Sequence, residues 1–216
     1  MTALPTEIEA KFFCNKTVLK ERLSELGAKL VKSECMMRRK HFDTPERRLH
    51  QIGGWIRLRD EGDKITLAYK QLESHSLGGM KEVEIIVDNF QRCEIFLAST
   101  GFVFTSYQEN QRESWLLNGV KIDIDTWPWL PPLVEVECLD EKKLWAVVAA
   151  LGLHQDAAFF GGIEIAYMKH FHITQEQYFT LDTIAFGSAP DILSTSGACI
   201  GVVMLVREDQ SLLFYY

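Results

Sequence analysis

The feature that most constrains this chain is a set of short segments in which charged and apolar residues alternate. In residues 7–11, the charged residues Glu7, Glu9 and Lys11 fall at every second position. Successive side chains of a β-strand point to opposite faces, so this spacing predicts a strand with one charged and one apolar face. The same phase recurs in residues 55–59, 82–85, 121–125 and 135–137. The sequence therefore predicts several strands that share a charged face.

The composition limits the partners and the compartment. The chain has 216 residues, ample for one large domain with a core, and its net charge of −7 argues against a general basic surface for nucleic acid. Its five cysteines are odd in number and lack C-x-x-C spacing, so neither a disulfide framework nor a zinc site is indicated. No leader pattern opens the chain, and no apolar run approaches the roughly 20 residues that span a bilayer. We therefore expect a cytoplasmic protein with no membrane segment.

Periodicity and turn signals divide the chain into strands and three helices. Helical spacing of apolar residues, with a glycine at or near each end, predicts helices over residues 16–26, 90–101 and 144–152. Strands are predicted over residues 7–12, 40–43, 55–60, 65–71, 81–87, 103–107, 113–117, 120–125 and 133–138, and Asn118-Gly119 predicts a hairpin. About eight antiparallel strands can enclose one small ligand. We therefore expect an α+β fold, an eight-stranded antiparallel β-barrel flanked by helices.

The charged strand faces can lie either on a solvated surface or around a cavity. Three amphipathic helices can cover the apolar faces, which leaves the charged faces to point inward. A dry interior would not hold so many charges, because each desolvated ion costs several kcal/mol unless it is paired or liganded. A water-filled tunnel that binds a metal ion and an anion satisfies both conditions.

The residue types in this tunnel suit a polyphosphate. Carboxylate oxygens favour Mg²⁺ or Mn²⁺, which bind through a few carboxylates together with substrate phosphates. Arginine holds phosphate oxygens with its planar fork, and Arg57 and Arg59 place two such forks about 7 Å apart on one strand face. A phosphate chain can therefore lie along this strand.

Together these residues resemble the CYTH superfamily, also called triphosphate tunnel metalloenzymes. The resemblance covers residues 6–174 and rests on the order and spacing of Glu7-x-Glu9-x-Lys11, His41-Phe42-Asp43-Thr44-Pro45, Trp55-Ile56-Arg57-Leu58-Arg59, Lys70, Glu82-x-Glu84, Arg112, Asp123 and Glu135-x-Glu137. It implies an eight-stranded antiparallel tunnel that binds a triphosphate with a divalent metal. Members include inorganic triphosphatases, thiamine triphosphatases, mRNA capping triphosphatases and class IV adenylyl cyclases.

The resemblance also implies roles for individual residues. The positions that match phosphate-binding residues are Lys11, Arg57, Arg59, Lys70 and Arg112, and those that match metal ligands are Glu7, Glu9, Asp123, Glu135 and Glu137, to which the phase of the pattern adds Asp125. Catalysis is assigned to Glu7, Glu9, Lys11, Arg57 and Arg59. Glu82 and Glu84 are expected in a supporting role, in which they order the basic residues or a water.

These roles predict a Mg²⁺- or Mn²⁺-dependent triphosphatase that hydrolyses tripolyphosphate or a small organic triphosphate such as thiamine triphosphate. A class IV adenylyl cyclase that forms cyclic AMP and pyrophosphate from ATP is the main alternative, and a binding module without catalysis is a further one. The expected partner is the small triphosphate, with no nucleic acid and no membrane, and a homodimer is left open. The tunnel domain is expected over residues 1–178, followed by an extension of unknown role over residues 179–216.

Overall fold

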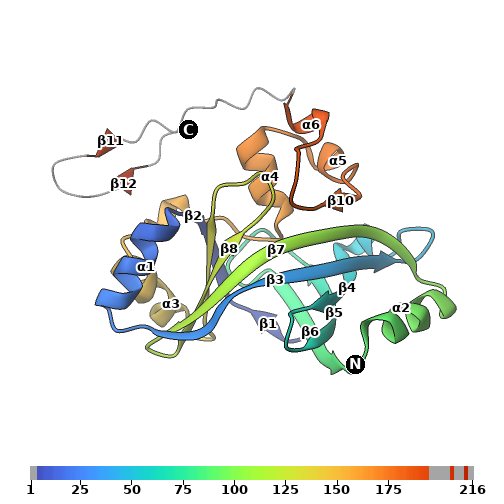
Figure 1. The fold of residues 1–216 in the computed structure, drawn as a ribbon, viewed down its shortest axis with the longest axis horizontal. Coiled ribbons are helices and arrows are strands. Elements are labelled where there is room, and N and C mark those ends of the chain that lie inside the picture. Colours follow the sequence, from blue (N-terminus) through green and yellow to red (C-terminus); the bar gives the residue numbers. More distant parts are fainter. Residues whose placement is uncertain (1–3, 195–204, 207–211, 214–216) are drawn as a thin grey trace.

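The computed structural model describes residues 4–194, 205–206 and 212–213, and its main feature is a strongly curved ten-stranded sheet (Figure 1). The strands of this sheet are β1 (Thr6–Glu7), β2 (Glu9–Phe13), β3 (Lys29–Asp43), β4 (Gly54–Asp60), β5 (Ile65–Leu72), β6 (Met80–Val87), β7 (Val103–Leu117), β8 (Val120–Thr126), β9 (Leu133–Glu137) and β10 (Thr183–Ile184). A separate antiparallel pair consists of β11 (Leu205–Val206) and β12 (Leu212–Leu213).

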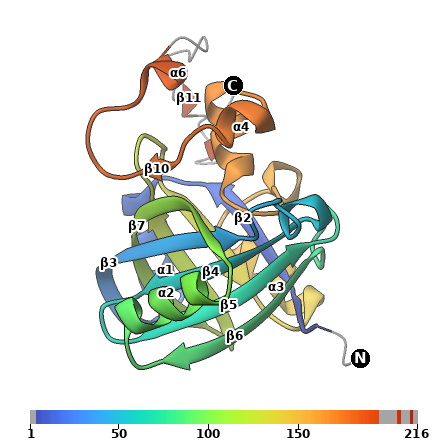
Figure 2. The same cartoon turned by 90° about the vertical axis from the view of Figure 1, so that its right-hand side faces the viewer.

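The helices flank this sheet. They are α1 (Lys16–Glu25), α2 (Phe90–Ser99), α3 (Glu141–Ala150), α4 (Glu164–Phe171), α5 (Gln175–Tyr178) and α6 (Asp191–Ser194), with short 3-10 turns at His50–Ile52 and Gln155–Ala157. The first three confirm the helices predicted over residues 16–26, 90–101 and 144–152. Figure 2 shows α2 on the outside of β4 to β6, and α4 and α6 at one end of the strands.

The prediction of eight strands closed into a barrel is wrong. The sheet has ten strands in the open order β1-β6-β5-β4-β3-β7-β8-β9-β2, and β10 pairs with β7 in parallel. The N-terminal segment divides at Ile8, because β1 pairs with β6 whereas β2 pairs with β9. The hydrogen-bonded order therefore ends at these two strands. The expected antiparallel α+β class is confirmed.

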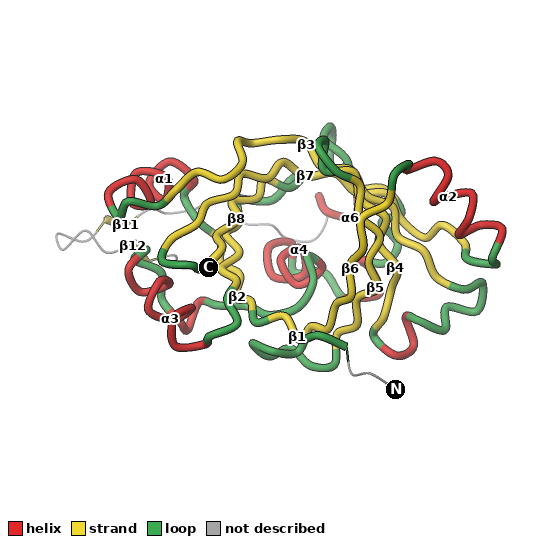
Figure 3. Tube along the Cα trace, turned by 90° about the horizontal axis from the view of Figure 1, so that it is seen from below, coloured by secondary structure: helices red, strands yellow, loops and turns green. Residues whose placement is uncertain are grey.

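Two long strands connect the two sides of the sheet. β3 and β7 have 15 residues each and pair along most of their length, whereas the sequence predicted only short pieces of both. β7 continues through the predicted hairpin into β8, with Leu117 opposite Val120. Both turn residues have positive φ, 53° at Asn118 and 80° at Gly119, as a tight hairpin of this type requires. Figure 3 shows β4 to β6 on one side and β2 and β8 on the other.

The apolar strand faces pack against the helices. Leu19 and Leu23 of α1 and Leu144 of α3 are buried against the outer faces of β2, β8 and β9, whose residues Ile122 and Val136 are fully buried. Burial of such a side chain stabilises the fold by about 1.5–3 kcal/mol. Because these helices cover the apolar faces from outside, the charged faces of the strands are directed to the interior.

The segment after α3 adds a second core at one end of the strands. Tyr167 of α4, Tyr178 of α5, Ile184 of β10 and Leu193 of α6 are buried together with Trp127, which follows β8. Leu193 lies within the expected extension over residues 179–216. After residue 194, most of this extension lies outside the described residues. The predicted boundary at residue 178 stays a prediction. Among the described helices, none is long and apolar enough to cross a membrane.

Candidate triphosphate-binding site

A cavity of about 440 Å³ lies along the inner face of the curved sheet. Eight Asp or Glu and eight Lys or Arg side chains line it, which makes it densely charged but balanced. Most of the predicted site residues contribute to this lining: Glu7, Glu9, Lys11, Arg57, Arg59, Lys70, Glu82, Glu84, Arg112, Glu135 and Glu137. The structure therefore brings together residues that lie up to 130 positions apart in the sequence.

One side of the cavity is here called the arginine wall. It consists of the cavity-lining residues Arg57, Arg59, Lys70, Glu82 and Glu84 on β4 to β6, and of Glu61 in the turn after β4, which contacts Arg59 from behind the lining. Arg57 Nη2 donates to Glu82 Oε1 at 2.7 Å and to Glu84 Oε2 at 2.8 Å. Arg59 Nη2 lies 2.5 Å from Glu61 Oε1 and 3.3 Å from Glu84 Oε2. Both guanidinium groups are buried and held in place by carboxylates.

Lys70 connects this wall to the N-terminal segment. Its Nζ lies 2.9 Å from Glu7 Oε2 and 2.9 Å from Glu82 Oε2. Burial, together with a hydrogen bond to Glu82, raises the pKa of Glu7 to about 8. The pKa of Glu82 is lowered, because the hydrogen bond with Glu7 and the charges of Arg57 and Lys70 outweigh burial. The two carboxyl groups therefore share one proton near neutral pH.

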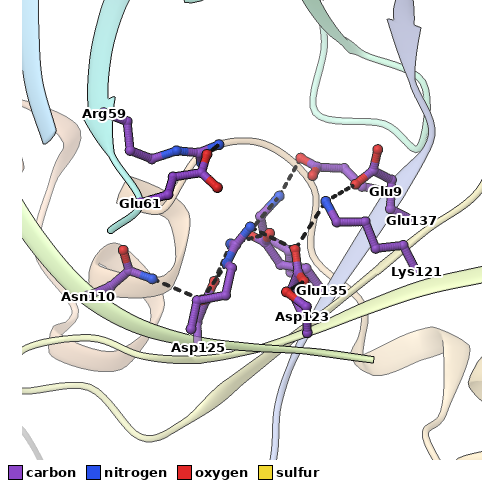
Figure 4. Close-up of polar contacts among 12 residues, drawn as sticks. Glu9, Arg59, Glu61, Asn110, Lys121, Asp123, Asp125, Glu135 and Glu137 are labelled. Carbon is purple, nitrogen blue, oxygen red and sulfur yellow. Dashed lines mark hydrogen bonds and ion pairs between the residues drawn. The ribbon is translucent and has the colours of Figure 1, made fainter. Parts of the chain in front are cut away.

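The opposite side, here called the carboxylate wall, lies on β2, β7, β8 and β9 (Figure 4) and consists of the cavity-lining residues Glu9, Lys11, Arg112, Lys121, Glu135 and Glu137 and the buried Asp123 and Asp125 behind them. Arg112 lies at its centre and donates to Asp123 Oδ2 at 2.8 Å, to Asp125 Oδ2 at 2.5 Å and to Glu135 Oε2 at 2.6 Å. These three charges outweigh burial and raise the pKa of Arg112 further above its usual value. The guanidinium is therefore fixed in a single orientation.

Two lysines offset part of the remaining negative charge. Lys11 Nζ donates to Glu9 and lies 3.7 Å from Glu135 Oε1, and Lys121 Nζ lies 2.9 Å from Glu137 Oε2. Burial acts to lower the pKa of Lys11, but the charges of Glu9 and Glu135 outweigh it and raise that pKa. The ammonium group of Lys11 therefore stays charged although it is buried.

The predicted metal ligands fall into two groups in the structure. Glu7, Glu9, Glu135 and Glu137 line the cavity, whereas Asp123 and Asp125 are buried behind Arg112 and do not line it. Asp125 is fully buried and also accepts a hydrogen bond from Asn110 at 2.9 Å. Both aspartates thus contact the guanidinium of Arg112 and not the cavity space.

The donor set at the cavity surface fits a hard divalent cation. Glu9 and Glu137 are directly opposite each other in the β2–β9 pairing, and such a pair of like charges is destabilising unless a cation offsets it. Among the described residues, no group of three or more His, Cys, Asp and Glu side chains is arranged to bind a metal by itself.

Sequence reasoning missed several residues of the cavity, above all Arg39, Gln108 and Tyr178. Arg39 stands within Arg38-Arg39-Lys40, where three consecutive cations hide the alternation that identifies the other strands. Gln108 lies in the polar run of β7, which has no apolar face to set the phase. The only signal for such a residue in the sequence is a cation that stands within a strand segment of mixed charges.

The stretch before the first 3-10 turn contains a carboxylate, that of Asp43, which hydrogen-bonds to backbone N–H groups. Asp43 is buried, and its Oδ1 accepts hydrogen bonds from the N–H groups of Thr44 at 2.6 Å and Leu49 at 2.9 Å. Its Oδ2 accepts from the N–H of His50 at 2.9 Å. One carboxylate thus holds a loop of the cavity rim. The same loop requires glycine at residue 53, because a Cβ there would lie 2.4 Å from the carbonyl oxygen of Leu72.

A sequence model of the CYTH domain family matches residues 5–152. The chain belongs to the CYTH family. No curated protein matches the chain in sequence. Of the tunnel that the resemblance implies, the structure shows the charged cavity and the antiparallel strands around it.

Solved structures share the fold of this CYTH protein at low sequence identity. A candidate adenylate cyclase from Vibrio parahaemolyticus is 14% identical, with a TM-score of 0.67 over 76% of this chain and 98% of the other. The PH1012 protein from Pyrococcus horikoshii OT3 is 21% identical, with a TM-score of 0.61 over 70% and 93%. A candidate adenylyl cyclase from Hippeastrum, described as having a dominant triphosphatase activity, is 15% identical, with a TM-score of 0.52 over 81% and 95%.

Proposed function

We propose that this CYTH protein is a triphosphatase that uses Mg²⁺ or Mn²⁺ to hydrolyse inorganic tripolyphosphate or a small organic triphosphate. The observation that carries the proposal is the pairing of two unlike walls around one cavity. Arg57 and Arg59 lie on one side, and the carboxylates Glu9, Glu135 and Glu137 lie on the other. A module that only binds anions has no need for carboxylates beside its ligand unless a metal is bound as well.

The cations of both walls would bind the phosphate chain. Each is held by carboxylates before substrate enters, so that its orientation is fixed and little entropy is lost on binding. Arg57, Arg59 and Arg112 can each offer a planar fork to phosphate oxygens, and Lys11 and Lys70 add point charges. In this proposal Glu82 and Glu84 order Arg57, and Asp125 orders Arg112.

The carboxylates that line the cavity would hold the metal ion. Glu9, Glu135 and Glu137 on neighbouring strands, with Glu7 close by along the chain, supply the oxygen donors, and Asp123 lies opposite Glu135 in the β8–β9 pairing. When bound, a divalent ion would withdraw charge from the phosphate oxygens and lower the pKa of a water. Deprotonation of Glu7, whose pKa is raised to about 8, would be favoured by such an ion.

The chain's own residues then explain hydrolysis without a covalent intermediate. The two walls hold the triphosphate extended, so that water can attack the terminal phosphorus in line with the leaving oxygen. Arg57, Arg59 and Arg112 offset the charge that develops on the transferred group. Orthophosphate and pyrophosphate are the expected products from tripolyphosphate.

One observation favours a class IV adenylyl cyclase as the second candidate. Aromatic side chains of Trp55, Trp127, Tyr178 and Phe179 also line the cavity, and such rings can stack on a base. The same phosphate clamp would then hold ATP with its ribose 3′-hydroxyl in line. A thiamine ring system fits the same description, which keeps thiamine triphosphate among the candidate substrates.

Phosphorus NMR of the products tests the proposal. The purified chain is incubated with tripolyphosphate, ATP and thiamine triphosphate, each with Mg²⁺, with Mn²⁺ or with EDTA. Orthophosphate and pyrophosphate from tripolyphosphate, formed only with metal, would support the triphosphatase. Cyclic AMP and pyrophosphate from ATP would replace it by the cyclase, and no turnover of any substrate would leave a binding module.

A further inference from the structure

Arg39 of β3 is a cavity cation that none of the functional assignments uses. Its side chain is buried, with 6% of the residue surface exposed, and it lines the same cavity as the two walls. In the β3–β4 pairing Arg39 is directly opposite Arg59, so that two guanidinium groups share one face of adjacent strands. Like charges in such positions repel each other, and the chain tolerates this only if something offsets the repulsion.

The other buried cations of the cavity are each offset by a carboxylate. Those five are Lys11, Arg57, Arg59, Lys70 and Arg112. Within the described part of the chain, Arg39 forms no ion pair. Its Nη2 donates to the neutral amide oxygen of Asn110, and its guanidinium carbon lies 4.6 Å from the centre of the Trp127 ring.

Two N–H groups beside the contact of Arg39 with Trp127 lack a hydrogen-bond acceptor in the part of the chain that the structure describes. Arg39 Nε and the indole Nε1 of Trp127 are buried N–H donors without a partner among the described residues. Burial, and then the charges of Arg59, Arg57 and Arg112, lower the pKa of Arg39 well below its usual value. Buried donors on Arg39 and Trp127, with three further arginines nearby, call for an acceptor that carries negative charge.

We infer that Arg39, held against the ring of Trp127, is a further substrate-binding residue that binds one anionic phosphoryl group of the polyphosphate. The inference rests on the proposed function, because it takes a polyphosphate as the ligand of this cavity. Arg39 adds a guanidinium group from β3 to those of the arginine wall. This makes the site selective for a chain of several phosphoryl groups. Trp127 acts as a positioning residue, which keeps the guanidinium aimed into the cavity and leaves its own N–H for the same ligand.

Titration calorimetry of the full chain in EDTA tests this inference with tripolyphosphate, pyrophosphate and orthophosphate as probes. For Arg39→Gln we expect the affinity for tripolyphosphate to fall about 10- to 100-fold, the loss of one charge-assisted contact. Arg39→Lys keeps the charge without the fork and should lose less. Arg38→Gln is the matched control, because Arg38 is the preceding residue of the same strand, its side chain is 56% exposed and its Nε lies 3.8 Å from Glu109.

Thermal unfolding without ligand separates a binding role from a structural one. If Arg39 serves the ligand, Arg39→Gln removes a repulsion and should keep or raise the Tm, while the increase in Tm caused by tripolyphosphate becomes smaller. Unchanged affinity in Arg39→Gln would overturn the inference, and so would an equal loss in Arg38→Gln or a lowered Tm with Arg39→Lys binding no better than Arg39→Gln.

The outcomes also distinguish this inference from the proposed function. If the wild type binds tripolyphosphate without hydrolysing it, the triphosphatase proposal fails, whereas loss of binding in Arg39→Gln still supports the role of Arg39. If the wild type hydrolyses tripolyphosphate and Arg39→Gln binds it equally well, the triphosphatase stands and the role of Arg39 is removed. If the wild type binds none of the three anions in EDTA, the role of Arg39 is removed, whereas the triphosphatase is decided separately by the phosphorus NMR with metal.

Discussion

The arginine wall and the carboxylate wall use the same residue types in different proportions. On the arginine wall, three cations contact the three carboxylates Glu61, Glu82 and Glu84, so that the charges balance. On the carboxylate wall, three cations are outnumbered by the five carboxylates of Glu9, Asp123, Asp125, Glu135 and Glu137. In the proposed function this difference divides the roles: the arginine wall would orient guanidinium groups for phosphate, and the carboxylate wall would leave negative charge for a metal ion.

Glu135→Gln should have the largest effect, because it removes charge from the centre of the carboxylate wall. Glu135 contacts both Arg112 and Lys11, and burial of its carboxylate is outweighed by their charges, which lower its pKa. We expect metal-dependent turnover of tripolyphosphate to fall at least about 100-fold while some binding remains. Steady-state kinetics with varied Mg²⁺ measures this, with Glu21→Gln on the exposed face of α1 as the control. Full activity of Glu135→Gln would exclude the metal-binding role.

Arg57→Ala should weaken binding through the arginine wall. The change removes a fork and leaves Glu82 and Glu84 without this partner. Loss of a hydrogen bond to a charged group costs about 1.5–3 kcal/mol, so we expect a roughly 10- to 100-fold rise in the Kd for tripolyphosphate. Calorimetry gives the Kd, and Arg22→Ala on the surface of α1 is the matched control. A Kd equal to that of the wild type would remove Arg57 from the phosphate site.

The shared proton of Glu7 and Glu82 predicts a dependence of stability on pH. The pKa of Glu7 is raised from 4.5 to about 8 in the folded chain, so the folded state binds more protons than the unfolded state between these values. The resulting contribution to stability is fully present below about pH 4.5 and is lost as the pH rises through 8. Glu7→Gln should therefore gain stability relative to the wild type over this interval. Urea unfolding at several pH values would contradict the assignment if the difference stayed constant.

Lys121→Gln should have the smallest effect of the four. The Lys121 side chain is 50% exposed and pairs with Glu137 at the edge of the carboxylate wall, where solvent screens its charge. We expect the affinity for tripolyphosphate to fall less than about tenfold, with metal binding slightly strengthened because Glu137 is released. Calorimetric titrations with tripolyphosphate and with the metal ion test these two expectations. A loss as large as that of Arg57→Ala would mean that Lys121 is part of the phosphate clamp.

The sequence predicted the parts of this molecule that follow from alternation. A strand with one charged and one apolar face is recognisable at Arg57 and Arg59, and the family motifs made the inner face identifiable. The long strands β3 and β7 were predicted only in part, because neither shows clear alternation: Lys29 to Glu34 has one apolar residue on each face, Leu30 and Val31, and Ser106 to Arg112 is polar apart from Tyr107. The separate pairings of β1 and β2, which keep the sheet order open, leave no signal in composition or spacing.

Many residues that line the candidate cavity were named from the sequence, but Arg39, Gln108 and Tyr178 were missed and the partners of the charged residues were not predicted. The burial of Asp125 behind Arg112 depends on the β7–β8 register, in which these two residues are directly opposite. The position of Arg39 depends on the β3–β4 pairing and on Trp127, which comes from a distant loop. Such contacts between segments decide whether a charged residue faces the ligand or supports another side chain.

Tripolyphosphate binding in EDTA to the wild type, Arg57→Ala and Glu135→Gln tests the division between the two walls most directly. Without metal, the account predicts that Arg57→Ala loses affinity about 10- to 100-fold. Glu135→Gln should bind as tightly as the wild type or more tightly, because a negative charge near the phosphates is gone. An equal loss in both variants would show that the two walls act as one anion clamp and would contradict the account.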